Sequence, residues 1–241
     1  MSAYDEIADW YDAWAGSDPP VHDAPFQAVA ALMGSVDGLR VCDLACGQGR
    51  VSRYLADHGA SVVGVDISAR LLEIARRHEA EQPRGIDYRL VDATSLDVLA
   101  DAEFDGVLAF MSLMDMAALE PTLASVYRVL KPAGWFVFAI LHPCFHTGRS
   151  GELTTSDGLV RTVGQYFVEG FWRSDTRTGP PGKVGAYHRT LSTYLNTLLA
   201  HSFRLDRFEE PITSGRQAEL RPIWTEVPGS LVVRCVKVPP R

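Results

Sequence analysis

The sequence has few cysteines, few lysines and no long apolar run. Its 241 residues include four cysteines at scattered positions, which supply neither a disulfide framework nor the ligands of a closed four-cysteine zinc site. No stretch approaches ~20 uninterrupted apolar residues, and the opening "MSAYDEIADWYDAW" has acidic residues where a signal peptide has an apolar core. We therefore expect a cytoplasmic protein with reduced thiols and no membrane span.

Positive charge is also scarce. The 23 lysines and arginines are outnumbered by 30 acidic residues, and the formal net charge is -7. Proteins that bind nucleic acid usually have a basic surface, so we expect no nucleic-acid partner. The remaining proportions, 46% hydrophobic and 22% charged, are those of an ordinary globular domain with a large core.

Apolar runs and helical patterns alternate from about residue 39 to residue 141. Val, Leu, Ile and Phe dominate the runs with little alternation, as in parallel strands that are buried on both faces. The strands are predicted at 40–45, 61–66, 87–92, 104–110 and 135–141, and the helices at 50–58, 68–80 and 117–130. Ser68 is a suitable N-cap for the second of these helices. This order predicts an α/β fold with a doubly wound, mostly parallel sheet.

The alternation stops after residue 141. Residues 143–187 are rich in Gly, Ser, Thr and aromatics, and we interpret them as an insertion. "TLSTYLNTLLAHSF" then has leucines at helical spacing, and "FRLDRFEE" and "SLVVRCVKV" read as two further strands. The sheet is therefore expected to have seven strands.

The first strand leads into a glycine-rich turn, "VCDLACGQGR", at 41–50. Gly47 and Gly49 let a ligand approach the backbone at the start of the next helix. Ser52 replaces the third glycine of a dinucleotide-binding turn, and Asp43 would oppose a pyrophosphate. Asp66, at the end of the second strand, can accept hydrogen bonds from two ribose hydroxyls. Together these residues indicate a nucleoside with a positively charged tail.

With these motifs the chain resembles the class I S-adenosylmethionine-dependent methyltransferases over most of its length. The resemblance implies that Asp43 lies near the methionine ammonium, that Asp66 binds the ribose and that Asp92 binds the adenine amine. Ala45 stands where the family usually has the first glycine of the turn. The expected cofactor contacts are Tyr11, Asp43, Ala45, Gly47, Gly49, Asp66, Ile67, Asp92, Ala93, Phe110 and Met111.

The resemblance also implies a Rossmann-like architecture in which the last strand runs antiparallel beside the fifth. The whole chain, 1–241, is then one methyltransferase domain, with a helical cap at 1–35 and a substrate lid at 143–187. The alternative is that the three aspartates only terminate strands. Their occurrence at successive strand ends around one glycine turn favours a ligand.

The acceptor is expected to be a small planar molecule under the lid. The segment "AFMSLMD" after the fourth strand lacks the polar-Pro-Pro-aromatic motif of enzymes that methylate nucleic-acid amines. We predict substrate contacts at Phe145, Tyr166, Trp172 and Arg189, with Phe171 as a further stacking aromatic. The alternative is that these aromatics pack the insertion onto the sheet.

Two histidines, His142 and His188, are candidate bases for a hydroxyl or ring N–H acceptor, although each could instead be structural. His188 belongs to a His-Arg-Thr-Leu phrase similar to phrases in small-molecule methyltransferases of this class. In "AILHPCFHTG", His142, Cys144 and His146 have the spacing of metal ligands on one face of a strand. Pro143 opposes an extended backbone there, so we predict no metal.

The preferred function is transfer of a methyl group to an oxygen or nitrogen atom of a small aromatic or heterocyclic molecule. Methylation of a carbon atom of a quinone-type acceptor and a non-catalytic S-adenosylmethionine-binding subunit are the alternatives. An NAD-dependent oxidoreductase would need a glycine or alanine in place of Ser52. The sequence indicates no oligomeric state.

Overall fold

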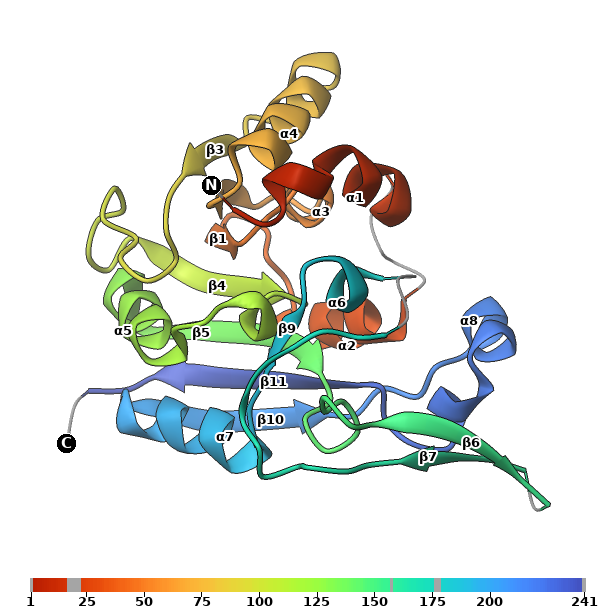
Figure 1. Cartoon of the computed structure of the whole chain (residues 1–241). Coiled ribbons are helices and arrows are strands. Elements are labelled where there is room, and N and C mark those ends of the chain that lie inside the picture. The colour runs from red at the N-terminus through yellow and green to blue at the C-terminus, as the bar shows by residue number, and fades with distance from the viewer. Residues whose placement is uncertain (1, 17–22, 157, 176–178, 240–241) are drawn as a thin grey trace.

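The computed structural model describes residues 2–16, 23–156, 158–175 and 179–239. Seven strands form the central sheet, in the order β10-β11-β5-β4-β1-β2-β3 (Figure 1). Their bounds are β1 (Arg40–Leu44), β2 (Ser61–Asp66), β3 (Asp87–Leu90), β4 (Phe104–Phe110), β5 (Leu130–Leu141), β10 (Phe203–Glu209) and β11 (Ser230–Lys237).

Six of these strands run in the same direction and one, β11, runs opposite to them. β1 pairs in parallel with β2 and β4, β2 with β3, and β4 with β5, whereas β11 runs antiparallel to both β5 and β10. The predicted seven-stranded sheet, with its last strand antiparallel beside the fifth, is confirmed. The strand order reverses between β1 and β4, and the carboxyl ends of strands at such a point form a crevice in open α/β sheets.

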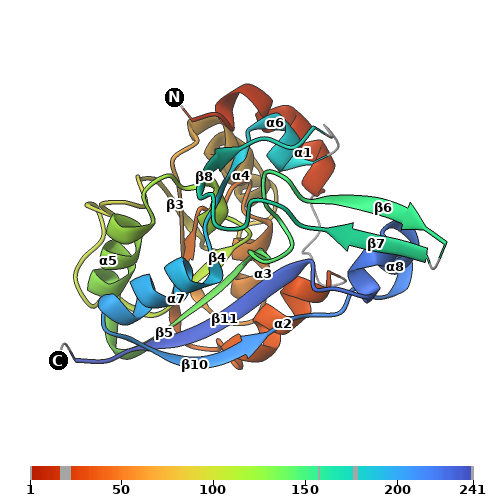
Figure 2. The same ribbon diagram turned by 60° about the horizontal axis from the view of Figure 1, so that its bottom comes forward.

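Helices cover both faces of the sheet (Figure 2). Neighbouring residues of a strand point to opposite faces. Val41 and Leu108 accordingly belong to the apolar cluster with α2, α3 and α4, while Cys42 and Val107 belong to the cluster with α5 and α7. The bounds of these helices are α2 (Ala24–Met33), α3 (Arg50–Asp57), α4 (Ala69–Glu81), α5 (Leu119–Val129) and α7 (Leu191–Ala200).

The strands and helices predicted between residues 39 and 141 have boundaries within two residues of the prediction, except at the start of β5. β3 ends at Leu90 and not at residue 92, and β5 begins at Leu130 and not at residue 135. The early start of β5 comes from a pairing between Leu130 and Phe104, after which the register with β4 shifts. The predicted N-cap is confirmed, since the Ser68 side chain accepts a hydrogen bond from the backbone N–H of Leu71.

The insertion after β5 contains two short antiparallel pairs. A hairpin of β6 (Gly151–Thr155) and β7 (Gly158–Thr162) projects beyond the sheet, beside α8 (Gly215–Leu220) in both views (Figures 1 and 2). The second pair joins β8 (Gly170–Trp172) to β9 (Ala186–His188). The remaining elements of the chain are α6 (Pro180–Lys183) and the 3-10 turns η1 (Asp5–Ile7), η2 (Leu113–Asp115) and η3 (Pro222–Thr225).

The region predicted as an N-terminal cap divides into two parts. Residues 2–16, with α1 (Ala8–Ala15), pack against α4, whereas α2 packs against β5 and β11 and belongs to the layer that covers the sheet. Residues 17–22 of this predicted cap, and residues 157 and 176–178 of the predicted lid, lie outside the described residues. Within the described part of the chain, no helix is long and apolar enough to cross a membrane.

Candidate functional site

A cavity of about 190 Å³ lies at the carboxyl ends of β1, β2 and β4. Its walls come from four places: residues 2–11, the turns after β1 and β2, residues 110–116 at and after the end of β4, and Phe171 with residues 184–187 of the insertion. The cavity therefore occupies the crevice that the strand order creates.

The turn after β1 is built from left-handed backbone. Ala45 and Gly47 both have φ +57° and line the cavity, and Gly49 has φ +82°. Ala45 adopts this conformation although it carries a Cβ, which is a strained arrangement for any residue but glycine. A Cβ on Gly47 would lie 3.6 Å from the Tyr11 ring, so Tyr11 covers the turn closely. Gly49 does not line the cavity; a Cβ there would lie 2.2 Å from the Tyr88 hydroxyl.

Asp66 is the predicted acid that faces the cavity. Its Oδ2 accepts a hydrogen bond from the Gly47 N–H at 2.8 Å, and its Oδ1 accepts one from the Ser68 N–H at 2.8 Å. Burial raises the pKa of Asp66, while these backbone hydrogen bonds oppose the increase. Each carboxylate oxygen has a second lone pair, so Asp66 can still accept from two ligand hydroxyls. Ile67, the next residue, also lines the cavity and is 55% exposed.

The other two predicted acids do not line the cavity. Asp43 is buried below the turn, where Ser52 donates a hydrogen bond of 2.5 Å from its hydroxyl to Oδ2. Burial raises the pKa of Asp43 to about 7, and the hydrogen bond from Ser52 limits the increase. Asp92 is exposed and accepts two hydrogen bonds from Thr94, through the backbone N–H and the hydroxyl, each at 2.8 Å. Ala93 packs against the core beside it.

The segment after β4 supplies the predicted Phe110 and Met111 and one residue that the sequence did not identify. Met111 has φ +53°, and its N–H donates to the Ala139 carbonyl at 2.8 Å. Asp115 lines the same cavity and accepts a hydrogen bond of 2.8 Å from the Tyr4 hydroxyl to its Oδ2. Burial raises the pKa of Asp115 to about 7, and the hydrogen bond from Tyr4 opposes the increase. The available signal was an isolated aspartate in the apolar run "AFMSLMDM".

The β8–β9 pair forms the wall of the cavity opposite the N-terminal segment. Phe171 pairs with Tyr187 in the ladder, and both side chains line the cavity with ring centroids 5.4 Å apart. Gly185 is required beneath them, because a Cβ there would lie 2.2 Å from the Phe171 ring. Trp172 and His188 belong to the other face of this pair and line a separate, small pocket.

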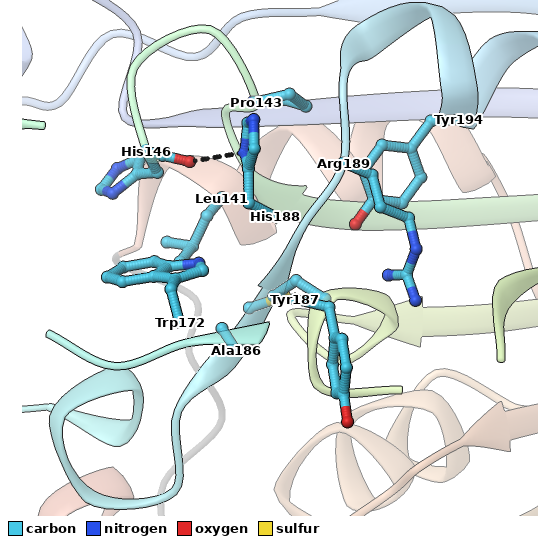
Figure 3. A pocket seen from close by; sticks show the side chains of 10 residues that line it. Leu141, Pro143, His146, Trp172, Ala186, Tyr187, His188, Arg189 and Tyr194 are labelled. Atoms are coloured by element: carbon cyan, nitrogen blue, oxygen red, sulfur yellow. Dashed lines mark hydrogen bonds between the residues drawn. The ribbon is translucent and has the colours of Figure 1, made fainter. Parts of the chain in front are cut away.

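Figure 3 shows this small pocket of about 10 Å³, with Trp172, His188 and Arg189 around it. The His188 ring lies between two carbonyl oxygens: Nδ1 is 3.1 Å from that of His146 and Nε2 is 2.8 Å from that of Tyr166. His188 therefore joins two segments of the insertion and does not reach the larger cavity.

Arg189, predicted to bind substrate, holds the segment after β4. Its guanidinium donates hydrogen bonds to the carbonyl oxygens of Leu113, Met116 and Ala117, at 3.3, 2.5 and 2.9 Å. The side chain is buried and lines only the small pocket. Its contacts fix the backbone on both sides of Asp115.

His142 lines neither cavity. Its Nδ1 accepts a hydrogen bond of 3.2 Å from the Cys144 N–H, and its Nε2 donates one of 2.8 Å to Glu210 Oε1. Burial lowers the pKa of His142, although Glu210 opposes the decrease. Phe145 packs on the His142 ring, and the Tyr166 hydroxyl accepts a hydrogen bond of 2.9 Å from the N–H of Leu191.

The side chains of the His-Cys-His triplet diverge. A turn follows β5, because the N–H groups of Phe145 and His146 both donate to the carbonyl oxygen of His142. His146 stacks on Trp224 with ring centroids 4.7 Å apart, whereas the His142 ring contacts Glu210. Among the described residues, no group of three or more His, Cys, Asp or Glu side chains is arranged to hold a metal ion.

Comparison with known proteins gives one matching family model and several relatives. The model, described as a methyltransferase domain, matches residues 42–138. A solved structure of an S-adenosylmethionine dependent methyltransferase from Mesorhizobium loti is 31% identical, with a TM-score of 0.77 over 89% of this chain and 98% of that one.

Several curated relatives carry the name ubiquinone biosynthesis O-methyltransferase, among them proteins from Thiobacillus denitrificans and Bordetella pertussis. The protein from Thiobacillus denitrificans is 34% identical over 105 residues, 44% of this chain and 45% of the relative. The protein from Bordetella pertussis is 34% identical over 137 residues, 52% of this chain and 55% of the relative. The chain therefore matches about half the length of these relatives.

Proposed function

The chain belongs to the class I S-adenosylmethionine-dependent methyltransferases, and we propose that it methylates an oxygen or nitrogen atom of a small aromatic or heterocyclic acceptor. One observation carries the proposal. A single cavity extends from Asp66 and the glycine turn to the aromatic pair Phe171 and Tyr187. It has one end suited to a nucleoside and one wall suited to a planar molecule.

The residues around the cavity fit S-adenosylmethionine. Asp66 would accept from the ribose hydroxyls, the turn at Ala45 and Gly47 would approach the ligand through its backbone, and Tyr11 would cover it. Within the described residues the lining includes two carboxyl groups and no lysine, arginine or histidine, which suits a positively charged ligand. When bound, the cofactor supplies an electrophilic methyl group on a sulfonium sulfur.

The wall opposite the cofactor end indicates the kind of acceptor. The aromatic rings of Phe171 and Tyr187 line this wall, and Met116 and Val184 add apolar surface. The absence of a basic side chain from the described lining disfavours a phosphate or carboxylate acceptor. The names of the curated relatives make a hydroxyl group the preferred acceptor. A cytoplasmic location remains part of the proposal, on the grounds of the sequence.

The proposal is tested by mass spectrometry of a small-molecule metabolite extract incubated with the protein and methyl-labelled S-adenosylmethionine. We expect one species, or a small set of related aromatic species, to gain one labelled methyl group. A matched reaction with the Asp66→Asn variant should show much less product, because Asp66 faces the cofactor end of the cavity. Absence of any labelled product, with no S-adenosylhomocysteine formed, would reject the proposal.

A further inference from the structure

Asp115 is positioned to contact an acceptor in the cavity. It is the last residue of η2, the 3-10 turn that follows Met111 and Ser112 after β4. Its side chain lines the cavity together with Phe171 and Tyr187. The Arg189 guanidinium donates three hydrogen bonds to backbone carbonyl oxygens on either side of Asp115. Its carboxyl group therefore has a fixed place in the wall.

One oxygen of this carboxyl group is committed and the other is not. Tyr4 donates to Oδ2 at 2.8 Å, and it is the only hydrogen-bond partner of the Asp115 side chain among the residues that the structure describes. By contrast, both oxygens of Asp66, the other lining carboxyl group, accept hydrogen bonds from backbone N–H groups. Oδ1 of Asp115 is thus the better acceptor for a proton that arrives from a ligand.

The charge state of Asp115 suits proton transfer at neutral pH. Burial raises its pKa to about 7, while the hydrogen bond from Tyr4 stabilises the ionised form. A general base works best when its pKa is near the working pH. The two histidines considered from the sequence lie elsewhere, His142 against Glu210 and His188 between two carbonyl oxygens of the insertion.

We propose that Asp115 is the catalytic base that takes the proton from the acceptor's hydroxyl group, and that Tyr4 is a positioning residue for its carboxylate. The inference rests on the proposed function. The acceptor oxygen forms the new bond to the methyl carbon, and the sulfur–carbon bond breaks with its electron pair staying on sulfur. The proton of the acceptor oxygen passes to Asp115 Oδ1, and the neutral carboxyl group later releases it to water.

The N-terminal segment completes this arrangement. Tyr4 lies in that segment, 111 positions from Asp115, and Asp5 anchors it by accepting a hydrogen bond of 2.7 Å from the Ser68 hydroxyl. Tyr4 reaches Asp115 from this segment, which also lines the cavity. The Asp115 carboxyl group is therefore positioned in part by the same segment that covers the cavity.

The test compares Asp115→Asn with the wild type on two hydroxyl acceptors, catechol and 4-nitrophenol, at equal pH. At about pH 8 catechol is mostly un-ionised, since a phenol has a pKa of about 10, and it needs a base; 4-nitrophenol, whose nitro group lowers the phenol pKa to about 7, is largely ionised and does not. We expect Asp115→Asn to lower kcat on catechol roughly 100-fold or more and to lower it far less on 4-nitrophenol. Asp97→Asn, which changes an exposed carboxyl group, is the matched control.

Tyr4→Phe tests the positioning role through pH. Removing a hydrogen bond that lowers the Asp115 pKa should move the acidic limb of the kcat profile on catechol to higher pH. The carbon-13 signal of the Asp115 carboxyl should show the same displacement of its titration midpoint. Tyr54→Phe, which keeps the ring contacts of Tyr54 with Phe26 and His58, should change neither measurement.

Each alternative outcome is distinct. Equal losses of Asp115→Asn on both acceptors, or no loss on either, would overturn the role as base, and unchanged titration in Tyr4→Phe would overturn the role of Tyr4. If the wild type methylated only amines from the metabolite extract, the role of Asp115 as the base for a hydroxyl acceptor would be rejected, while the proposed methyltransferase function would stand. If the wild type methylated nothing, both would be rejected.

Discussion

At the scale of single residues, Gly49 illustrates how packing and backbone conformation act together. It has φ +82°, and the Tyr88 hydroxyl occupies the position that a side chain would need, 2.2 Å from an ideal Cβ. Gly38 has a similar φ of +72° with nothing within 4 Å of its Cβ. A comparison of Gly49 with Gly38 therefore distinguishes the cost of backbone strain, which both share, from the cost of steric overlap, which only Gly49 has.

We expect Gly49→Ala to lower the free energy of unfolding by roughly 2–4 kcal/mol, the sum of backbone strain and overpacking. Gly38→Ala should lower it by about 1 kcal/mol, since only the strain applies. Urea denaturation of both variants measures the difference. Equal losses would show that Tyr88 moves aside freely.

Asp43 gives a prediction on pH dependence. Its pKa in the folded protein is raised to about 7, above the ordinary value of about 4, so the folded state binds this proton more tightly than the unfolded state. The contribution of the group to stability is therefore fully present below about pH 4 and is lost as the pH rises through about 7. Asparagine carries no such charge and can still accept the hydrogen bond from Ser52.

Asp43→Asn should thus become more stable relative to the wild type as the pH rises, by on the order of 2 kcal/mol between about pH 5 and about pH 8. Denaturation without cofactor at both pH values measures this change. The difference between Asp97→Asn and the wild type should stay constant. A constant difference for Asp43→Asn as well would contradict the burial assigned to this carboxyl group.

At the scale of elements, Asp5 joins the N-terminal segment to the start of α4. Asp5 accepts hydrogen bonds from the Ser68 hydroxyl and the Arg70 N–H, at 2.7 and 3.3 Å. Although burial acts to raise it, the pKa of Asp5 lies below its ordinary value because of the hydrogen bonds from Ser68 and from backbone N–H groups. The segment in turn places Tyr4 and Tyr11 over the cavity.

Asp5→Ala should weaken binding of S-adenosylhomocysteine roughly 3- to 10-fold, because the covering segment becomes less ordered. The free energy of unfolding should change little, since the core is untouched. Calorimetric titration and urea denaturation provide the two values. Glu6→Ala removes an exposed neighbouring carboxylate and should leave the affinity unchanged.

Arg189 links the insertion to the segment after β4. Its buried guanidinium satisfies three carbonyl oxygens, and hydrogen bonds to charged groups are worth about 1.5–3 kcal/mol each. We expect Arg189→Met to lower the free energy of unfolding by roughly 2–4 kcal/mol even without any ligand. If Arg189→Met instead raised KM and left the free energy of unfolding unchanged, the result would favour the substrate contact predicted from the sequence.

The sequence predicted the elements that depend on local patterns and missed contacts that depend on pairing. Buried parallel strands and the Ser68 cap are visible in short windows of sequence, and both are confirmed. Whether Tyr187 or His188 faces the cavity depends on the pairing of β8 with β9, which no local pattern specifies. Asp115 gains its environment from Tyr4, a contact that only the tertiary structure creates.

At the scale of the whole molecule, the sheet and its additions have separate tasks. The strand order leaves a crevice beside β1 and β4, and Asp66 faces it from the end of β2. Residues 2–16 cover one side of the crevice and the β8–β9 pair forms the other. The two sides meet where Lys183 Nζ of α6 lies over the Trp10 ring of α1, 5.0 Å from the ring centroid. The cofactor end is thus set by the sheet and the acceptor end by the insertion.

Calorimetric titration of S-adenosylhomocysteine, with NAD as the comparison ligand, tests the assignment of this cavity most directly. We expect one site per chain for S-adenosylhomocysteine, no heat with NAD, affinity for S-adenosylhomocysteine reduced roughly 10-fold or more in Asp66→Asn, and wild-type affinity in Asp97→Asn. Binding of NAD, or undiminished affinity for S-adenosylhomocysteine in Asp66→Asn, would contradict this assignment.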